Sequence, residues 1–274
     1  MTVPVVSPLT AEPSGDVSGD APLALHRPAM ARVHDHLLGG KDNYAADREL
    51  ARRVLEVLPQ AAAAARDGRA FLARAVRACA ERGIRQFLDL GCGLPAADNL
   101  HQMAARHAAG TRVVYVDADP LVIAHARALL IEDGHIAALR ADLRDPQSIL
   151  GAAQVRRLID PAEPVALVFS CVLHFLPDPY APVAAVGAAA APGSALVVSH
   201  ATADHARAAV AEAARRYAAA GAGPLVLRGA AEIARLFGPF ALLPPGLVPA
   251  GHWNAGTTPP PGDAVLYAGV GIRP

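Results

Sequence analysis

The sequence predicts an α/β fold: a mostly parallel sheet with helices on both faces, an antiparallel last strand and an N-terminal helical cap. Three observations predict this architecture. From Ile84 onward, short apolar runs alternate with helical stretches, and strands that alternate with helices form parallel sheets. The apolar runs are nearly continuous, as expected of strands that are covered on both faces. Before Ile84 the apolar residues recur at helical spacing and no strand intervenes.

The first 83 residues divide into a tail and three helices. Residues 1–25 combine Pro, Ser, Gly and Asp with little periodicity, which predicts a disordered tail. Residues 26–83 predict the helical cap. Pro28 suits the first position of a helix, and Gly39-Gly40 end that helix. We expect the second helix to end at about residue 58 and the third to span about residues 61–82.

Residues 84–274 form the predicted sheet domain. Its first five strands are each expected to be followed by a helix. Two later strands, joined by a Pro/Gly-rich loop, are expected to form an antiparallel pair at the sheet edge. The expected strands are Gln86–Leu90, Arg112–Val116, Ala137–Arg140, Val165–Cys171, Ala195–Ser199, Phe240–Leu243 and Ala264–Val270. The expected helices lie at about 98–108, 120–133, 146–158, 179–190 and 203–220.

Composition limits the function. The chain has 274 residues with 25 basic and 25 acidic side chains, so its formal net charge is zero. This argues against a nucleic-acid partner, because proteins that bind nucleic acids carry an excess of basic side chains. Three scattered cysteines do not predict a disulfide framework. No apolar run is long enough to span a bilayer and no secretory signal is recognised, so we expect a cytoplasmic protein with no membrane partner.

The strongest local signal is a glycine-rich turn after the first expected strand. Residues 87–95 read as a buried strand, a Gly-x-Gly turn and the start of a helix. Glycine lets the backbone turn tightly and approach a ligand, and a helix N-terminus attracts negative charge. Ala96 stands where the dinucleotide fingerprint has its third glycine, which argues against a pyrophosphate ligand. The candidate ligand contacts in this segment are Asp89, Gly91, Cys92 and Gly93.

Two further acids follow the ends of the next strands. Asp117 comes about two dozen residues after Gly93, the spacing at which a carboxylate accepts hydrogen bonds from ribose hydroxyls. The alternative is that Asp117, like Asp119, only caps the helix that begins at Pro120. Asp142 follows the third strand, where a carboxylate can accept a hydrogen bond from the amino group of adenine. Together these features predict an adenosyl ligand at the carboxyl edge of the sheet.

These features resemble class I S-adenosylmethionine-dependent methyltransferases, in which an acid-x-Gly-x-Gly turn without the third glycine is typical. Residues 32–47, Arg-Val-His-Asp-His-Leu-Leu-Gly-Gly-Lys-Asp-Asn-Tyr-Ala-Ala-Asp, resemble the N-terminal signature of one bacterial methyltransferase family, formerly catalogued as a domain of unknown function. The resemblance covers about residues 28–272. His34 and His36 depart from it, since aromatic residues are usual at both positions, and Trp253-Asn254 lacks the usual basic-proline continuation. These departures concern the substrate contacts.

The resemblance implies a Rossmann-like class I methyltransferase fold, S-adenosylmethionine as cofactor, and methyl transfer to an acceptor that we expect to be a small molecule. The sulfonium already makes the methyl group electrophilic, so the protein has mainly to align the reactants and exclude water. One alternative is a regulatory protein that binds S-adenosylmethionine or S-adenosylhomocysteine without catalysis. A nicotinamide-dependent oxidoreductase is disfavoured, because position 37 is leucine and no Tyr-x-x-x-Lys dyad is present.

Individual residues receive roles from the motifs and the resemblance. Lys41, the only lysine in the chain, and Arg32 are expected to bind the methionine carboxylate of the donor; alternatively Lys41 anchors the cap or is a solvated residue after a helix. His174 follows the fourth strand and is the candidate general base, with a packing role as the alternative. His34 and His36 lie two positions apart on a helix and point in different directions, so no metal site is expected. The remaining candidate donor contacts are Gly40, Asn99, Ala118, Leu143 and Ser170.

Overall fold

The protein is described by a computed structural model that covers residues 24–131, 133–256 and 264–274. All but the last two residues of the predicted tail, 1–25, therefore lie outside the described residues, as do residues 257–263 of the predicted loop before the last strand. In the three described ranges every helix is too short or too polar to cross a bilayer.

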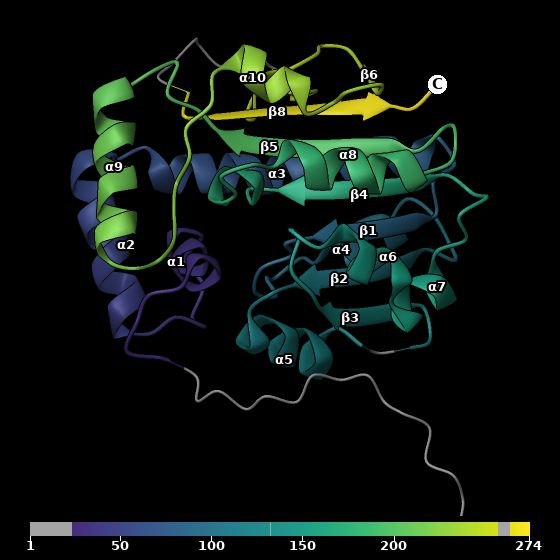
Figure 1. Ribbon diagram of the computed structural model, residues 1–274, viewed down its shortest axis with the longest axis horizontal. Coiled ribbons are helices and arrows are strands. Elements are labelled where there is room, and N and C mark those ends of the chain that lie inside the picture. Colours follow the sequence, from purple (N-terminus) through teal and green to yellow (C-terminus); the bar gives the residue numbers. More distant parts are fainter. Residues whose placement is uncertain (1–23, 132, 257–263) are drawn as a thin grey trace, which may run out of the picture.

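One mixed sheet forms the centre of the described structure (Figure 1). Its strands lie in the order β3-β2-β1-β4-β5-β8-β6, and β7 also pairs with β8. The first five strands are parallel to one another, whereas β8 runs antiparallel to β5 and β6. The prediction of a mostly parallel sheet with an antiparallel last strand is confirmed. The strands are β1 Gln86–Leu90, β2 Arg112–Asp117, β3 Ile136–Arg140, β4 Val165–Ser170, β5 Ala195–Ala201, β6 Ala241–Leu242, β7 Val248–Pro249 and β8 Leu266–Ile272.

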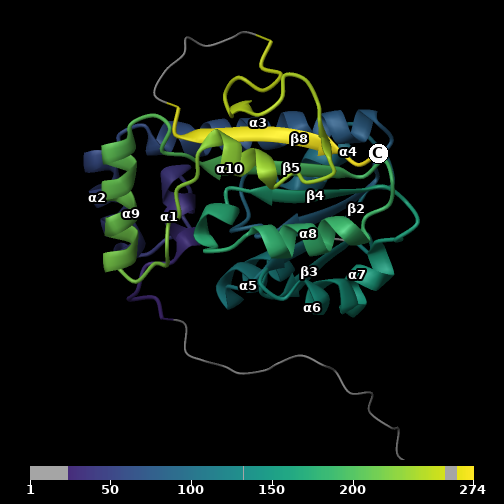
Figure 2. The ribbon, with the colours of Figure 1, turned by 45° about the horizontal axis from the view of Figure 1, so that its top comes forward.

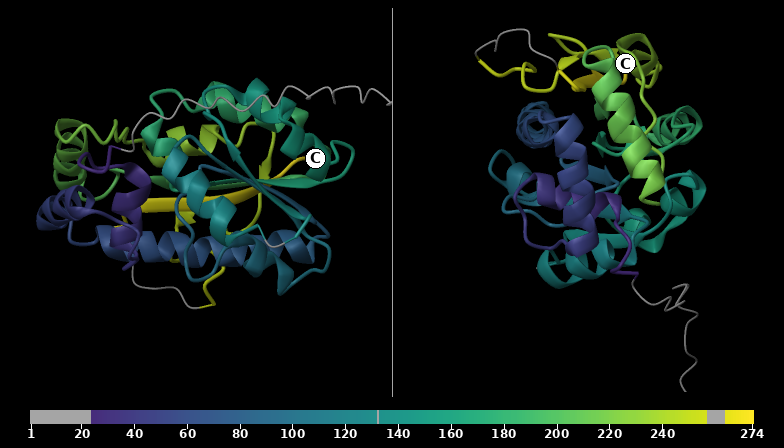
Figure 3. Two further views of the ribbon diagram at one scale, coloured as in Figure 1. Left: turned by 90° about the horizontal axis from the view of Figure 1, so that it is seen from below. Right: turned by 90° about the vertical axis from the view of Figure 1, so that its left-hand side faces the viewer.

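Helices cover both faces of the sheet (Figures 2 and 3). Successive side chains of a strand point to opposite faces, so Phe87 and Leu88 of β1 enter two different apolar cores. The core around Phe87 includes Phe71 of α3, and the core around Leu88 includes Val183 of α8. The first face carries α3 Ala61–Glu81, α4 Leu100–Ala105 and α5 Pro120–Leu129. The second carries α6 Pro146–Gly151, α7 Ala153–Leu158, α8 Tyr180–Ala189 and α10 Ala230–Arg235.

A third apolar cluster lies beyond the carboxyl ends of the parallel strands (Figure 1). It joins α1 Met30–Leu37, α2 Ala45–Val57 and α9 Arg207–Ala219 through Val33, Leu50 and Tyr217 among others. We propose that the chain divides at residue 83 into the helical cap, 26–83, and the sheet domain, 84–274. In terms of packing, α3 shares its core with the sheet, and α9 joins the two N-terminal helices.

The chain departs from the expected elements in short segments. The helix expected at about 146–158 is interrupted at Ala152, whose backbone is extended with φ −66° and ψ 142°. Gly151, a poor helix former, ends the first piece. A single turn of 3-10 helix, η1 Leu173–Phe175, follows β4, and neither it nor α10 nor β7 was expected. The turn η1 matters for function because it forms part of a cavity wall.

Candidate functional site

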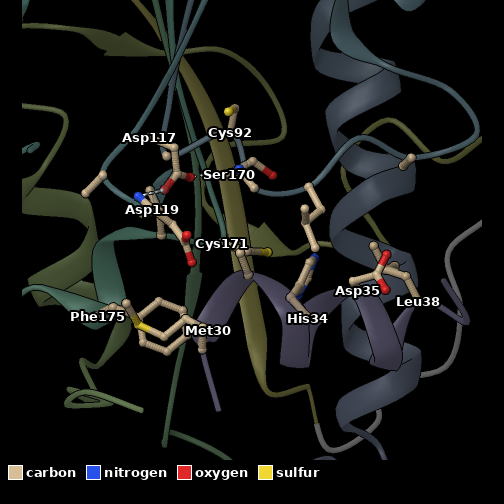
Figure 4. A pocket seen from close by; sticks show the side chains of 18 of the residues that line it. Met30, His34, Asp35, Leu38, Cys92, Asp117, Asp119, Ser170, Cys171 and Phe175 are labelled. Atoms are coloured by element: carbon tan, nitrogen blue, oxygen red, sulfur yellow. Dashed lines mark hydrogen bonds between the residues drawn. The ribbon is translucent and has the colours of Figure 1, made fainter. Parts of the chain in front are cut away.

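A cavity of about 1130 Å³ lies at the carboxyl ends of the parallel strands. Turns after the strands line one side, and α1 with the turn that follows it lines the other (Figure 4). Open α/β sheets bind ligands at this edge. Pockets for single drug-sized ligands measure about 300–1000 Å³, so this cavity has room for more than one small molecule.

The structure brings nearly all of the predicted donor contacts to this one cavity, and the exception is Arg32. Their role in binding remains a prediction. Those that line the cavity are Gly40, Lys41, Asp89, Gly91, Cys92, Gly93, Asn99, Asp117, Ala118, Asp142, Leu143 and Ser170.

The turn after β1 needs glycine for two reasons. Gly91 and Gly93 have φ of +81° and +67°, a left-handed conformation that side chains disfavour. At Gly91 an added Cβ would also lie 2.4 Å from Cγ2 of Val172, so the turn and the segment after β4 pack in close contact. The backbone N–H groups of Gly91 and Cys92 donate to the carbonyl oxygen of Val116, which joins the turn to β2.

Asp117 and Asp119 have different local roles. The carboxylate of Asp117 accepts hydrogen bonds from the backbone N–H groups of Gly93 and Asp119, both at 3.0 Å. Burial raises the pKa of Asp117, although these N–H groups oppose the shift. Asp119 instead accepts from the backbone N–H of Leu121 at 2.8 Å and is the N-cap of α5. Asp117 therefore does not cap the helix but fixes the glycine turn against β2 while it lines the cavity.

Asp89 and Arg69 form the charged centre of the cavity wall. Burial raises the pKa of Asp89 to about 7, against the effect of Arg69, and Asp117 adds to the rise. Arg69 comes from α3, lines the cavity, and was missed by the sequence analysis. The signal that could have found it is Gly68 in the middle of a helix: a Cβ there would lie 3.0 Å from Sγ of Cys171, so α3 passes close to the sheet at this point.

The surroundings of Cys92 in the glycine turn disfavour its thiolate. Burial raises the pKa of Cys92 well above the usual thiol value, and the nearby Asp89 and Asp117 raise it further. A thiol reacts as the thiolate, which this environment disfavours. Cys92 therefore serves as a small side chain of the wall.

Arg32 belongs to the junction of α1 and α2. Its Nε donates to Asp47 at 2.9 Å, and the side chains of the pair are 5% and 0% exposed. Asp47 also accepts from the backbone N–H groups of Ala29 at 2.9 Å and Tyr44 at 2.8 Å. The structure thus places Arg32 in a buried ion pair outside the cavity lining, where it holds two helices together.

The turn after α1 places Lys41 at the cavity. Asn43 donates to the carboxylate of Asp35 at 2.8 Å and to the carbonyl of Gly40 at 2.9 Å. A Cβ at Gly40 would lie 2.0 Å from Oδ1 of Asp35, so the turn closes tightly on that carboxylate. Lys41 follows directly, is exposed, and lines the cavity.

Asp142 and Asn99 line the cavity with side chains that already have partners. Asp142 forms an ion pair with Arg144 at 2.5 Å, and this hydrogen bond lowers the pKa of the carboxyl. Asn99 accepts from the backbone N–H of Ala96 at 3.0 Å and stands at the N-cap of α4. Both residues hold their own turns as well as the cavity wall.

His174 lies behind the cavity wall and does not line it. It is buried, its Nδ1 accepts from the backbone N–H of Ala201 at 3.2 Å, and its ring packs on Phe175 and His200. Burial lowers its pKa well below the usual imidazole value. Nε2 of His200 in turn faces the guanidinium of Arg228 at 3.2 Å and accepts from it, since arginine only donates. The structure does not bring His174 together with the other predicted residues.

Helix α1 supplies other side chains to the cavity, which the sequence analysis did not assign there. Met30 and His34 line it from one face of α1, and Phe175 of η1 lines it as well (Figure 4). Burial, together with the nearby Arg69, lowers the pKa of His34 to about 4, so its imidazole is neutral at pH 7.

The comparisons agree with this geometry. A family model described as S-adenosyl methyltransferase matches residues 18–274. A crystal structure of a proposed methyltransferase from Thermobifida fusca YX is similar, with 40% identity, a TM-score of 0.87, and coverage of 94% of this chain and 99% of that one. A DUF574 family protein from Streptomyces avermitilis MA-4680 has 37% identity, a TM-score of 0.86, and coverage of 91% and 99%. The plantazolicin methyltransferase BpumL, at 10% identity and a TM-score of 0.51 over 89% of this chain and 96% of that one, shares the fold. No curated protein matches the chain.

Proposed function

The chain belongs to the S-adenosyl methyltransferase family, and on that premise we propose that it methylates a small molecule bound in the same cavity as the donor. The donor is S-adenosylmethionine, whose sulfonium supplies an electrophilic methyl group. The protein's own part is to hold donor and acceptor in line and to keep water away.

The residues of the cavity fit this donor. The main support for the proposal is the position of Asp117 at the end of β2, where its carboxylate lines the cavity. It lies beside the glycine turn, in which a side chain at Gly91 would clash with Val172. In this assignment Asp117 accepts hydrogen bonds from the ribose hydroxyls. Asp142 and Leu143, after β3, contact the adenine.

The opposite end of the donor meets charged side chains. We assign the carboxylate of its methionine part to Lys41 and Arg69, and its ammonium and sulfonium charges to the neighbourhood of Asp89. All three side chains line the cavity, and Arg69 takes the role that the sequence analysis gave to Arg32. A carboxylate whose pKa is raised by burial gains a favourable interaction when a cation binds beside it.

The lining also supports a small-molecule acceptor rather than a nucleic acid. The cavity is lined by three basic side chains and six acidic ones, and this excess of acidic groups repels phosphate. The basic ones are Lys41, Arg69 and Arg144, and the acidic ones are Asp35, Asp42, Asp89, Asp117, Asp119 and Asp142. The chain as a whole carries no net charge, so no basic excess compensates for this.

Donor binding is expected to depend on pH through Asp89. Its pKa is about 7 in the free protein, and a bound cation favours the ionised form. Binding of S-adenosylmethionine therefore releases protons, and the affinity rises with pH until it levels off above about pH 7. We expect the Kd to fall about sixfold between pH 5.5 and 7.5 if binding lowers the pKa of Asp89 by about one unit.

Calorimetry in two buffers of different ionisation enthalpy measures this proton release. In Asp89→Asn the pH dependence is expected to flatten, because the amide does not titrate. An equal dependence in the wild-type chain and in Asp89→Asn would place the donor's cationic end elsewhere. Absence of S-adenosylmethionine binding at every pH would contradict the proposed function itself.

A further inference from the structure

We propose that the cavity end between Met30, His34 and Phe175 binds a small uncharged acceptor with an aromatic body and a hydroxyl group, and that His34 takes the hydroxyl proton. The inference rests on the proposed function, since it assumes methyl transfer in this cavity. It assigns the role of base to a residue of α1 in place of His174.

The position of His34 is the first observation. Met30 and His34 are four residues apart on α1, a spacing that places both on one face of the helix. Both line the cavity, and in Figure 4 this face of α1 lies opposite the strand ends that carry Asp117 and Ser170. A molecule held between α1 and the donor would thus touch His34. His174 lies behind the wall, and its Nδ1 is engaged by the backbone of Ala201.

The chemistry of the surrounding wall is the second observation. Met30 and Phe175 both line the cavity, as do Leu176, Pro177 and Pro224. A thioether and a phenyl ring together favour an aromatic body, because sulfur and π-faces both pack well on flat rings. These five side chains carry no charge. An uncharged molecule therefore enters without the desolvation cost that an anion would meet here.

The charged groups around His34 are the third observation. Arg69 of α3 lies near enough to lower the pKa of His34 and keep its imidazole neutral. Asp35, the next residue on α1, is turned toward Asn43 and accepts its amide hydrogen bond. His174 of η1 lies behind it, and burial keeps that ring neutral as well. His34 is therefore neutral at pH 7 and can accept a proton. The neighbouring carboxylate on α1, Asp35, is hydrogen-bonded to Asn43 instead of to His34.

The proposed step balances. An oxygen lone pair of the hydroxyl forms a bond to the donor's methyl carbon, and the carbon–sulfur bond breaks with its electron pair going to sulfur. As this bond forms, the hydroxyl becomes a stronger acid and gives its proton to a ring nitrogen of His34, which returns it to solvent, so the base assists the methyl-transfer step itself. An alkylated oxygen that still carries its proton is a much stronger acid than an imidazolium. A histidine with a lowered pKa is thus basic enough for this transfer.

The test uses 2-naphthol and 2-naphthoate, which share a ring system and differ in charge, with the chain saturated by S-adenosylhomocysteine. We expect 2-naphthol to bind at least about tenfold more tightly than 2-naphthoate. With S-adenosylmethionine as donor, 2-naphthol should yield 2-methoxynaphthalene. In His34→Gln this rate at pH 7 should fall about 100-fold, the usual contribution of a general base. It should recover as the pH approaches the ionisation of naphthol itself, because the naphtholate needs no base.

His36→Gln is the matched control, since His36 lies on the same helix but does not line the cavity. Its rate should equal that of the wild-type chain. The inference is overturned if 2-naphthol fails to bind, if 2-naphthoate binds equally well, or if His34→Gln is as fast as His36→Gln or remains slow at high pH. If S-adenosylhomocysteine still binds, each of these results contradicts only the assignment of the acceptor site and leaves the proposed function standing. Loss of that binding in the wild-type chain contradicts the proposed function.

Discussion

Replacing Asp117 by alanine is expected to weaken binding of S-adenosylhomocysteine about 100-fold or more, because each hydrogen bond to a charged group contributes about 1.5–3 kcal/mol. The variant loses the proposed acceptor of both ribose hydroxyls. It also loses the carboxylate that holds the backbone N–H of Gly93 at 3.0 Å, so the glycine turn is less well fixed. Isothermal titration calorimetry measures the Kd directly.

Asp145→Ala is the matched control for this variant. Asp145 lies in the loop between β3 and α6, and it caps α6 by accepting from the backbone N–H of Ser148 at 3.2 Å. It does not line the cavity, so its loss removes a cap and no ligand contact. Asp145→Ala should bind S-adenosylhomocysteine like the wild-type chain. If both variants bind with unchanged affinity, Asp117 has no part in holding the donor.

Replacing Asp47 by alanine should lower the free energy of unfolding by about 3–5 kcal/mol, the usual cost of leaving one partner of a buried ion pair alone. The change leaves the guanidinium of Arg32 without its carboxylate in a site that is 5% exposed. It also removes the acceptor of the backbone N–H groups of Ala29 and Tyr44. Urea unfolding followed by circular dichroism gives the difference in free energy.

Glu49→Ala on the same helix serves as its control. Glu49 pairs with Arg52 at 2.7 Å, but the side chains of this pair are 56% and 60% exposed, so water replaces the lost contact. Its midpoint in urea should lie close to that of the wild-type chain. An equally large shift in both variants would show that Arg32 and Asp47 do not form a special junction between α1 and α2.

The sheet could be read from the sequence because its determinants are local. Each parallel strand is a short apolar run, and β1 has the predicted bounds Gln86–Leu90. The site at the strand ends followed from the same reading, since Gly91 and Gly93 come just after β1 and Asp117 is the last residue of β2. Parallel strands bring such positions to one edge whatever the details of packing.

The remaining parts of the site depend on packing between distant segments. Arg69 reaches the cavity because α3 crosses the sheet near Cys171, and the only local trace of that crossing is Gly68, which does not by itself say what the helix packs against. Arg32 had the right sequence motif for a donor contact, but its partner Asp47 comes from the next helix. His174 was placed correctly after β4, yet η1 turns it behind the wall. The same turn brings its neighbour Phe175 to the cavity.

A crystal structure of the chain with S-adenosylhomocysteine tests the central claim most directly. It should show the ribose hydroxyls within hydrogen-bonding distance of the Asp117 carboxylate, the backbone of Gly91 and Gly93 against the ligand, and the sulfur facing the side of the cavity that α1 lines. S-adenosylhomocysteine bound away from the carboxyl ends of β1 and β2, or with its ribose out of reach of Asp117, would contradict the account.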